Sequence, residues 1–389
     1  MTVGPTLDVV LRNDTDDATE LYAHVTGSDD KGLVLLAADG KTLHRPASPS
    51  STLQPLAADC AIKLGGRNGS RIVKMPRISA ARIWFSKARP LTFFVNPGPA
   101  LVEPSATNRS DENYNLDWGF CEFTWNENEL YANVSFVDFV SLPISLQLVT
   151  GNGAVKTVPG LLPDGRERVG AALEEQAARD GRGWDKLVIR RDGGYAAPLR
   201  VLSPNAGGVL FPGLFDGYYQ SYVDAVWRKY EAEDLTVDTQ FTWGKVRGRV
   251  RPSDGRLVFT GPGSSSFARP AAADVFSCST GPFAAGGGGG DASEQMLRLN
   301  IGARLAAALN RSTLVTDANQ PDGEVVERYY QEFVTNHYAR ACHEAAVEGR
   351  GYAFPYDDVG PAGGKDQSGF VNDANPRLLT VAVGRPLDG

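Results

Sequence analysis

Short apolar runs separated by turn-forming residues fill the first 150 positions of the chain. Each run is rich in β-branched and aromatic residues and is bounded by Gly, Pro, Asn or Asp, a pattern typical of β-strands. The clearest runs cover residues 7–13, 21–27, 32–38, 81–87 and 91–96. Several such strands at intervals of about ten residues predict a sandwich or a barrel. A longer run at 135–150 adds more strand, and Pro143 inside it implies an edge or a bulge.

From about residue 160, helical periodicity replaces strand alternation. We predict four helices, at residues 167–181, 216–230, 294–310 and 324–349. The first and the last end at glycine, as helices commonly do. Between the helices, the glycine-rich segment 281–293 is typical of a flexible loop.

Strand alternation returns at residues 376–384. The order of elements therefore predicts a mixed α+β protein. We expect a β domain at 1–158, a helix-rich α/β domain at 159–350, and a segment at 351–389 that returns to the β domain.

Composition narrows the class of partner. The chain has 389 residues, a net charge of −7 and a pI of about 5.3. This acidic balance argues against nucleic acid or a membrane surface as a partner, and no apolar stretch is long enough to span a bilayer. The locally basic run 245–256 alternates in polarity, which indicates a solvated strand face rather than a binding patch.

The cysteines do not form a metal-binding motif. Cys60, Cys121, Cys278 and Cys342 lack the close spacing of zinc or iron–sulfur sites. Two disulfides and four buried free thiols are both compatible with the sequence. The start, Met1–Gly4, has neither the basic nor the apolar part of a signal peptide, so we expect none in this chain.

Common catalytic motifs are also missing. The sequence contains no phosphate-binding glycine loop, no G-x-S-x-G turn and no H-E-x-x-H pair. His337 and His343 are six positions apart on a predicted helix and do not share a face, so we interpret them as structural. We therefore expect neither a metal nor an organic cofactor.

Two carboxylates remain as candidates for chemistry. Strand alternation in "CEFTWN" places Glu122, Thr124 and Asn126 on one face, opposite two aromatic residues. Such a polar stripe suits hydrogen bonds to a polyol, although an ordinary solvated face has the same pattern. Asp138 lies between apolar neighbours in "SFVDFV", so we expect it to be desolvated, with a raised pKa unless it is paired. An Asp at a strand end that accepts backbone amides is the alternative interpretation.

Acid pairs of this kind hydrolyse glycosidic bonds, but the expected hairpin opposes the pairing. If residues 126–129 form a simple turn, Glu122 lies opposite Asn133. On a straight strand Asp138 would then be roughly 16 Å away. Retaining enzymes need a separation of about 5–5.5 Å and inverting enzymes about 6.5–9.5 Å. The chain between Asn133 and Asp138 must therefore bend if the two acids act together.

Several longer stretches resemble glycoside hydrolase family 64, the endo-β-1,3-glucanases with a thaumatin-like barrel. They include "LDVVLRNDTDDATELYAHVTG", "LTFFVNPGPALVEPSATNRSDENYNLDWGFCEFTWN", "LYANVSFVDFVSLPISLQL" and "GYAFPYDDVG", in the family's order and over nearly the whole chain. The resemblance implies a thaumatin-like β-sandwich or barrel domain, a helix-rich α/β domain and a wide cleft between them.

The resemblance also assigns roles to individual residues. It implies that Glu122 is the general acid and Asp138 the general base of an inverting hydrolase, at the family's 16-residue spacing. Thr124, Asn126 and Tyr131 match the family's sugar contacts. Arg82 and Asn133 match positions that line the acidic cleft of thaumatin-like proteins, where Asn133 replaces the usual Asp and lowers the charge.

The resemblance therefore implies a secreted, monomeric hydrolase of laminarin, curdlan or fungal cell-wall glucan, with the signal peptide absent from this chain. The alternative is a non-catalytic glucan-binding protein of the thaumatin-like type, for which the acid pair would have no use. An intracellular structural protein is a third interpretation, which rests only on the missing signal peptide.

Overall fold

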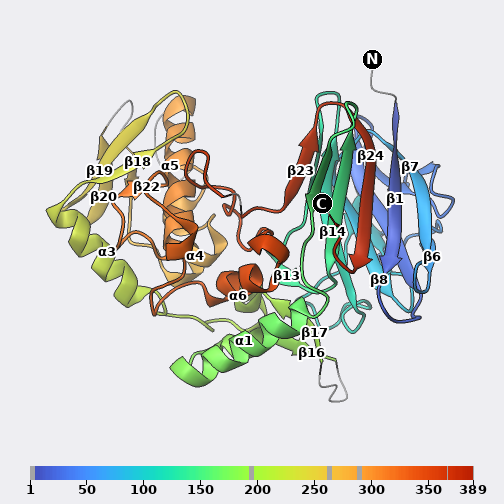
Figure 1. Ribbon diagram of the computed structural model, residues 1–389, viewed down its shortest axis with the longest axis horizontal. Coiled ribbons are helices and arrows are strands. Elements are labelled where there is room, and N and C mark those ends of the chain that lie inside the picture. Colours follow the sequence, from blue (N-terminus) through green and yellow to red (C-terminus); the bar gives the residue numbers. More distant parts are fainter. Residues whose placement is uncertain (1–4, 192–196, 261–264, 287–290, 366, 389) are drawn as a thin grey trace.

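The computed structural model describes residues 5–191, 197–260, 265–286, 291–365 and 367–388. They form a mixed α+β fold, as expected, with an all-β half and a half that combines helices with smaller sheets (Figure 1). The chain start Met1–Gly4 and residues 287–290 of the glycine-rich segment lie outside the described residues.

Two sheets make up most of the β half. The first has the order β15-β14-β24-β1-β7, and the second the order β23-β12-β11-β8-β2-β3-β4, with β6 beside β2. Their strands are β1 (Thr6–Asp14), β2 (Leu21–Asp29), β3 (Gly32–Leu36), β4 (Leu43–His44), β6 (Ile62–Gly65), β7 (Ser70–Pro76), β8 (Ile78–Lys87), β11 (Trp118–Trp125), β12 (Leu130–Asn133), β14 (Ile144–Thr150), β15 (Val155–Val158), β23 (Phe370–Asp373) and β24 (Pro376–Gly384). A small sheet joins β5 (Gln54–Pro55), β9 (Phe94–Asn96) and β10 (Ala100–Val102).

The two large sheets pack face to face around an apolar core (Figure 1). On β1 every second side chain is buried, such as Val9 and Leu11, and Ile83 and Phe85 on β8 are also buried two positions apart. This is the period that a strand with one buried face requires. The last strand, β24, lies between β1 and β14, so the chain ends in the sheet in which it begins.

The second half contains two further sheets and all six α-helices of the described residues. One sheet has the order β21-β20-β19-β18-β22 and the other the order β13-β17-β16. The strands are β13 (Phe139–Val140), β16 (Val188–Arg190), β17 (Pro198–Leu202), β18 (Leu235–Asp238), β19 (Lys245–Arg251), β20 (Arg256–Thr260), β21 (Ser265–Phe267) and β22 (Asn319–Gln320). The helices are α1 (Gly165–Asp180), α2 (Pro204–Leu210), α3 (Gln220–Ala232), α4 (Ala272–Ser277), α5 (Ala292–Arg311) and α6 (His337–Ala345).

Three of the four predicted helices are present. Helix α1 ends at Gly181, whose left-handed conformation is the usual helix stop. Helix α5 matches its prediction closely, and α3 begins four residues later than expected. In β19 the arginines are exposed and alternate with buried positions, which confirms the solvated-face interpretation of the basic run.

The fourth helix prediction, 324–349, is wrong over its first half. Within 324–349 the chain forms one α-helix, α6, which begins at His337. Short 3-10 turns lie at 326–328 and 347–349. Asn336 starts α6 by accepting a hydrogen bond from the Ala339 amide at 3.0 Å. Upstream, the buried Glu324 bonds to the end of α5, a long-range contact that helical periodicity does not reveal.

The predicted run 135–150 is divided by its proline. Pro143 lies between β13 and β14, where the chain passes from one half of the molecule to the other. All four cysteines are free and buried, which settles the choice that the sequence left open.

A buried arginine joins α5 to the segment that leads back to the β half. The Arg311 guanidinium forms ion pairs with Glu324 at 3.3 Å and with Asp357 at 3.1 Å. It also donates to the Val359 carbonyl. The three charged side chains are at most 2% exposed. The two ion pairs and the hydrogen bond to Val359 offset part of the cost of burying these charges.

We expect Arg311→Met to lower the free energy of unfolding by ~3–5 kcal/mol, because two carboxylates would stay buried without a cation. Urea unfolding followed by tryptophan fluorescence measures the change. Arg251→Ala removes an exposed ion pair with Asp254 and serves as the control, with little effect expected. A variant at Arg311 as stable as the wild type would show that the buried pairs contribute no net stability.

Candidate active site

A row of side chains crosses the outer face of the larger sheet. Arg82 on β8 lies opposite Glu122 on β11, Glu122 lies opposite Asn133 on β12, and Asn133 lies opposite Phe370 on β23. Directly opposed residues of antiparallel strands have side chains on the same face. The β11–β12 hairpin has the register expected from the sequence, with Trp125 opposite Leu130.

The alternation expected for β11 is confirmed. Phe123 and Trp125 are buried in the sandwich core, whereas Glu122 and Thr124 point to the outer face. Thr124 lies opposite Tyr131, so a second polar row runs beside the first. A pocket of about 430 Å³ lies over both rows and is lined by Ala80, Ala81, Arg82, Glu103, Glu122, Phe123, Thr124, Tyr131 and Asn133. It brings together five of the seven residues that the sequence proposed for the site.

Arg82 is the only cation that lines this pocket among the described residues. Its guanidinium lies 3.1 Å from the Glu122 carboxylate and 2.6 Å from that of Glu103. It also stacks over the rings of Phe120 and Trp84, with centroid distances of 4.6 and 5.4 Å. Packing and ion pairs together fix the direction of the guanidinium.

Glu103 was not among the predicted site residues. It follows β10 in "ALVEP", where a single acid between Val102 and Pro104 has no distinguishing pattern. Burial raises the pKa of its carboxyl group, the nearby Arg82 guanidinium lowers it, and the Glu122 charge raises it, with a net upward shift. Only the folded structure brings this acid to Glu122.

Asn133 contributes an unused polar atom to the pocket. Its side-chain oxygen Oδ1 is buried and has no hydrogen-bond partner among the described residues. A buried acceptor without a partner costs free energy unless a ligand or water supplies a donor.

Asn126 does not line this pocket. Its Oδ1 accepts hydrogen bonds from the backbone amides of Asn128 at 2.8 Å and Glu129 at 3.1 Å. The side chain therefore stabilises the turn between β11 and β12 in the manner typical of Asn.

Asp138 is exposed, so the prediction that it is desolvated is wrong. The prediction assumed a regular strand, but β12 ends at Asn133 and residues 137–138 form a bend. After the bend, the Phe139 ring lies 5.9 Å from the ring of Phe120. Phe120 is two positions from Glu122 on the same strand face. The bend therefore returns the chain to the face that carries Glu122, and the 16 Å estimate for a straight strand does not apply.

Backbone contacts hold Asp138 in this position. The Ser203 amide at the start of α2 donates to the Asp138 carbonyl at 2.9 Å. The Tyr338 hydroxyl on α6 donates to the Phe136 carbonyl at 2.6 Å. Asp138 thus depends on the second half of the molecule, whereas Glu122 depends on the β half.

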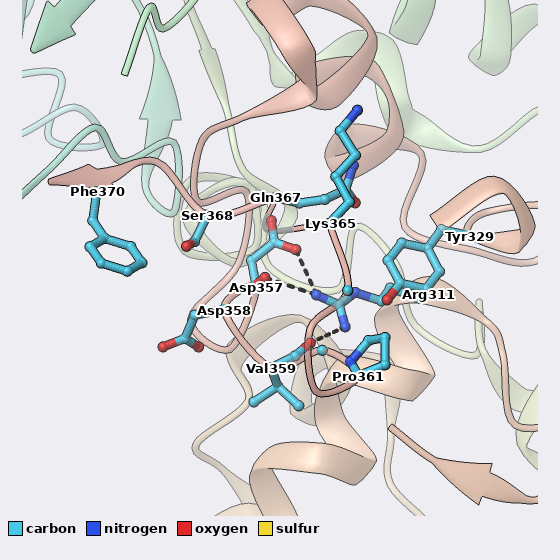
Figure 2. Close-up of a pocket in the computed structure, with 12 residues that line it drawn as sticks. Arg311, Tyr329, Asp357, Asp358, Val359, Pro361, Lys365, Gln367, Ser368 and Phe370 are labelled. Carbon is cyan, nitrogen blue, oxygen red and sulfur yellow. Dashed lines mark hydrogen bonds and ion pairs between the residues drawn. The ribbon is translucent and has the colours of Figure 1, made fainter. Parts of the chain in front are cut away.

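Tyr131 connects this pocket to a second one. Its ring stacks on Phe370 with a centroid distance of 5.2 Å, and its hydroxyl lies 2.9 Å from that of Tyr352. Phe370 also lines a pocket of about 300 Å³ (Figure 2). The stacked pair of rings therefore lies between the two pockets.

The second pocket is lined by a structural ion pair and by a second acid, Asp358. Figure 2 shows Arg311 held by Asp357 and the Val359 carbonyl, with Asp358 directed away from Arg311, on the side of Phe370. Burial raises the pKa of Asp358, and the neighbouring Asp357 charge adds to the shift. Asp357 itself is committed to Arg311 and to His343 Nε2 at 2.8 Å.

His337 and His343 make structural contacts, as predicted. His343 contacts Asp357 and the Gly349 carbonyl, and His337 contacts the Phe333 carbonyl. Burial lowers the pKa of His337 to about 4. Within the described ranges, no cluster of His, Cys, Asp and Glu is arranged to hold a metal ion. Nor is any helix in these ranges long and apolar enough to span a bilayer.

Comparisons with known proteins agree with this architecture. Residues 5–383 match the model of glycoside hydrolase family 64, described as beta-1,3-glucanase. A glucan endo-1,3-beta-glucosidase of Cellulosimicrobium cellulans is 30% identical over 391 residues, which cover 98% of this chain and 65% of that protein. A protein of Arthrobacter sp. (strain YCWD3) has the same name, identity and coverage.

Solved structures show the same fold. A laminaripentaose-producing beta-1,3-glucanase in complex with laminaritetraose has a TM-score of 0.85 and 31% identity, with 99% of this chain and 100% of that chain covered. A family 64 beta-1,3-glucanase domain from Clostridium beijerinckii has a TM-score of 0.72 and 21% identity, with 98% and 99% covered, which supports the fold alone.

The fold and the match over nearly its whole length define a member of a glycoside hydrolase family. This chain belongs to glycoside hydrolase family 64, the beta-1,3-glucanases. It spans about 65% of the length of the two curated relatives that it matches.

We expect Asn126→Ala to lower the free energy of unfolding by ~1 kcal/mol, because two turn amides lose their acceptor. Thermal or urea unfolding measures the loss. Asn126→Asp keeps the acceptor and should retain most of the stability. Unchanged stability of the alanine variant would contradict the turn role.

Proposed function

We propose that this protein is an endo-acting hydrolase of β-1,3-glucans such as laminarin, curdlan and fungal cell-wall glucan. The observation that carries the proposal is the pocket in which Glu122, Arg82, Thr124, Tyr131 and Asn133 converge on one sheet face. Family membership supports the same activity. The products would be β-1,3-gluco-oligosaccharides.

Glu122 is the proposed general acid. It is 37% exposed, so a glycosidic oxygen can reach it from the pocket. In its protonated form it donates to the oxygen of the breaking bond, and the leaving sugar departs with that proton. The contact with Arg82 also orients the carboxyl group before the substrate binds.

Asp138 is the proposed general base. Its exposure, which overturned our expectation of burial, suits a base that must meet a water molecule. It would take a proton from the water that attacks the anomeric carbon on the face opposite the leaving group, which inverts the configuration. Its negative charge would also favour the oxocarbenium-like transition state.

The remaining pocket residues, and Asn126 in the turn outside the pocket, are proposed as sugar contacts. The unpartnered Asn133 Oδ1 suits a sugar hydroxyl donor, and Thr124 and Tyr131 offer hydroxyl groups on the same face. Asn126 uses its Oδ1 in the turn, so its Nδ2 group is the one that a sugar would meet. Arg82 is proposed to act through Glu122 and by direct contact with hydroxyls.

We further propose that the substrate lies in a wide cleft between a thaumatin-like β domain, formed by residues 1–158 and 351–389, and a mixed domain at 159–350. The stacked rings of Tyr131 and Phe370 between the two pockets support a continuous path for a glucan chain. Secretion and a monomeric state are part of the same proposal, and the activity needs neither a metal nor a cofactor.

A non-catalytic glucan-binding protein is the alternative, since the same pocket suits binding alone. Incubation with laminarin and curdlan separates the two functions. Soluble oligosaccharides in the supernatant support the hydrolase. Sedimentation with curdlan without release of sugar would support the binding protein.

We expect Glu122→Gln and Asp138→Asn each to lower the rate of laminarin hydrolysis at least ~100-fold, because each removes one proton-transfer group. Binding to curdlan should change little. Reducing-sugar release and a pull-down measure the two properties. Glu127→Gln, at an 88% exposed position of the hairpin turn, is the matched control. Near-normal activity of either variant would remove that residue from the mechanism.

Inversion predicts that each cut initially releases an α-anomeric reducing end. Proton NMR of the first products, recorded before mutarotation, detects this anomer directly. A β-anomer as the first product would indicate retention and would contradict the role of Asp138 as a base acting on water.

A further inference from the structure

One guanidinium serves two carboxylates in the candidate active site. Arg82 donates through Nη1 to Glu103 at 2.6 Å and through Nε to Glu122 at 3.2 Å. Glu122 comes from β11, and Glu103 follows β10 in a different sheet. Arg82 therefore links two acids that come from different sheets.

The charges in this pocket do not balance. Among the described residues, its titratable side chains are Arg82 from β8, Glu103 after β10, Glu122 from β11 and Tyr131 from β12. A tyrosine hydroxyl ordinarily carries no charge near neutral pH, so one cation faces two carboxyl groups. The Arg82 guanidinium cannot move freely toward either acid, because it packs on the rings of Phe120 and Trp84.

This arrangement affects which form of Glu122 is favoured. A guanidinium paired with a single carboxylate strongly favours the ionised form, which cannot donate a proton. A second carboxylate on the same guanidinium weakens that effect and adds like-charge repulsion. Glu103 is close enough to do both, because it accepts from Arg82 Nη1 at 2.6 Å and lines the same pocket as Glu122.

We propose that Glu103 is a positioning residue for the general acid: it holds one side of the Arg82 guanidinium and adds a negative charge, so that Glu122 keeps its proton at the pH of catalysis. The inference rests on the proposed hydrolase function and adds a third acid to that site. Burial is the main cause of the raised pKa of Glu103, and the Glu122 charge adds to it against the effect of Arg82, so the two carboxyl groups interact.

Glu103→Gln tests the proposal because the amide oxygen can still accept from Arg82 while the charge is lost. Arg82 would then act on Glu122 alone, and Glu122 would lose its proton at lower pH. We expect the alkaline limb of the kcat/KM profile for laminarin to move down by about one pH unit, with a rate loss of about tenfold above the limb. The acidic limb, assigned to Asp138, should stay in place.

A second readout does not require activity. The side-chain carboxyl carbon of Glu122, followed by NMR across pH, should titrate at lower pH in the Glu103→Gln variant than in the wild type. Glu103→Asp keeps the charge and should leave both the limb and the titration close to wild type. Glu127→Gln removes an exposed carboxylate on the same hairpin and should also leave both unchanged.

The outcomes separate the two proposals. A wild-type protein that releases no sugar from laminarin overturns the hydrolase function, whatever the variants do. An active wild type whose alkaline limb and Glu122 titration are the same in Glu103→Gln overturns the role of Glu103 alone. A uniform loss of rate at every pH, with no shift in the limb, would show that Glu103 only holds the fold and would also overturn the inference.

Discussion

Hydrogen-bond register between β8, β11 and β12 is the constraint on which the site depends. Because β11 pairs with a strand on each side, Arg82, Glu122 and Asn133 stand in one row on the outer face. A slip of one residue would turn Glu122 into the sandwich core and expose Phe123. The apolar inner face thus fixes the position of the polar outer face, and the core selects which acids reach the pocket.

The bend after Asn133 transfers the chain from one half of the molecule to the other. Beyond β12, the Val134 amide bonds to the Gly369 carbonyl and the Phe136 amide to that of Tyr352. These acceptors replace the strand partners that a longer β12 would have had. The backbone amides of Val134 and Phe136 therefore keep hydrogen bonds where the chain turns. The second half of the molecule holds Asp138 and the β half holds Glu122. The relative position of the two carboxyl groups therefore depends on how the halves pack.

Two arginines in this protein show how burial changes the role of similar ion pairs. Arg311 and Arg82 each contact two carboxylates. Arg311 is 2% exposed and its partners are buried with it, so the cluster fixes the loop that leads to β23. Arg82 is 29% exposed and lies in an open pocket, where its charge acts on groups that a substrate can reach. Water access, more than partner type, separates the buried Arg311 cluster from the Arg82 cluster in the candidate site.

The sequence by itself determined the features that depend on near neighbours. Period-two alternation predicted β1, β8 and β11, turn residues predicted the β11–β12 register, and the pattern of "CEFTWN" placed Glu122 on the outer face. Only the tertiary structure decided the features that distant segments create. It limited the helix expected at 324–349 to the second half of that range, exposed Asp138 at a bend, and brought Glu103 to Arg82. Local sequence patterns show which face of an element is buried. Contacts between residues far apart in the chain leave no periodic pattern in the sequence.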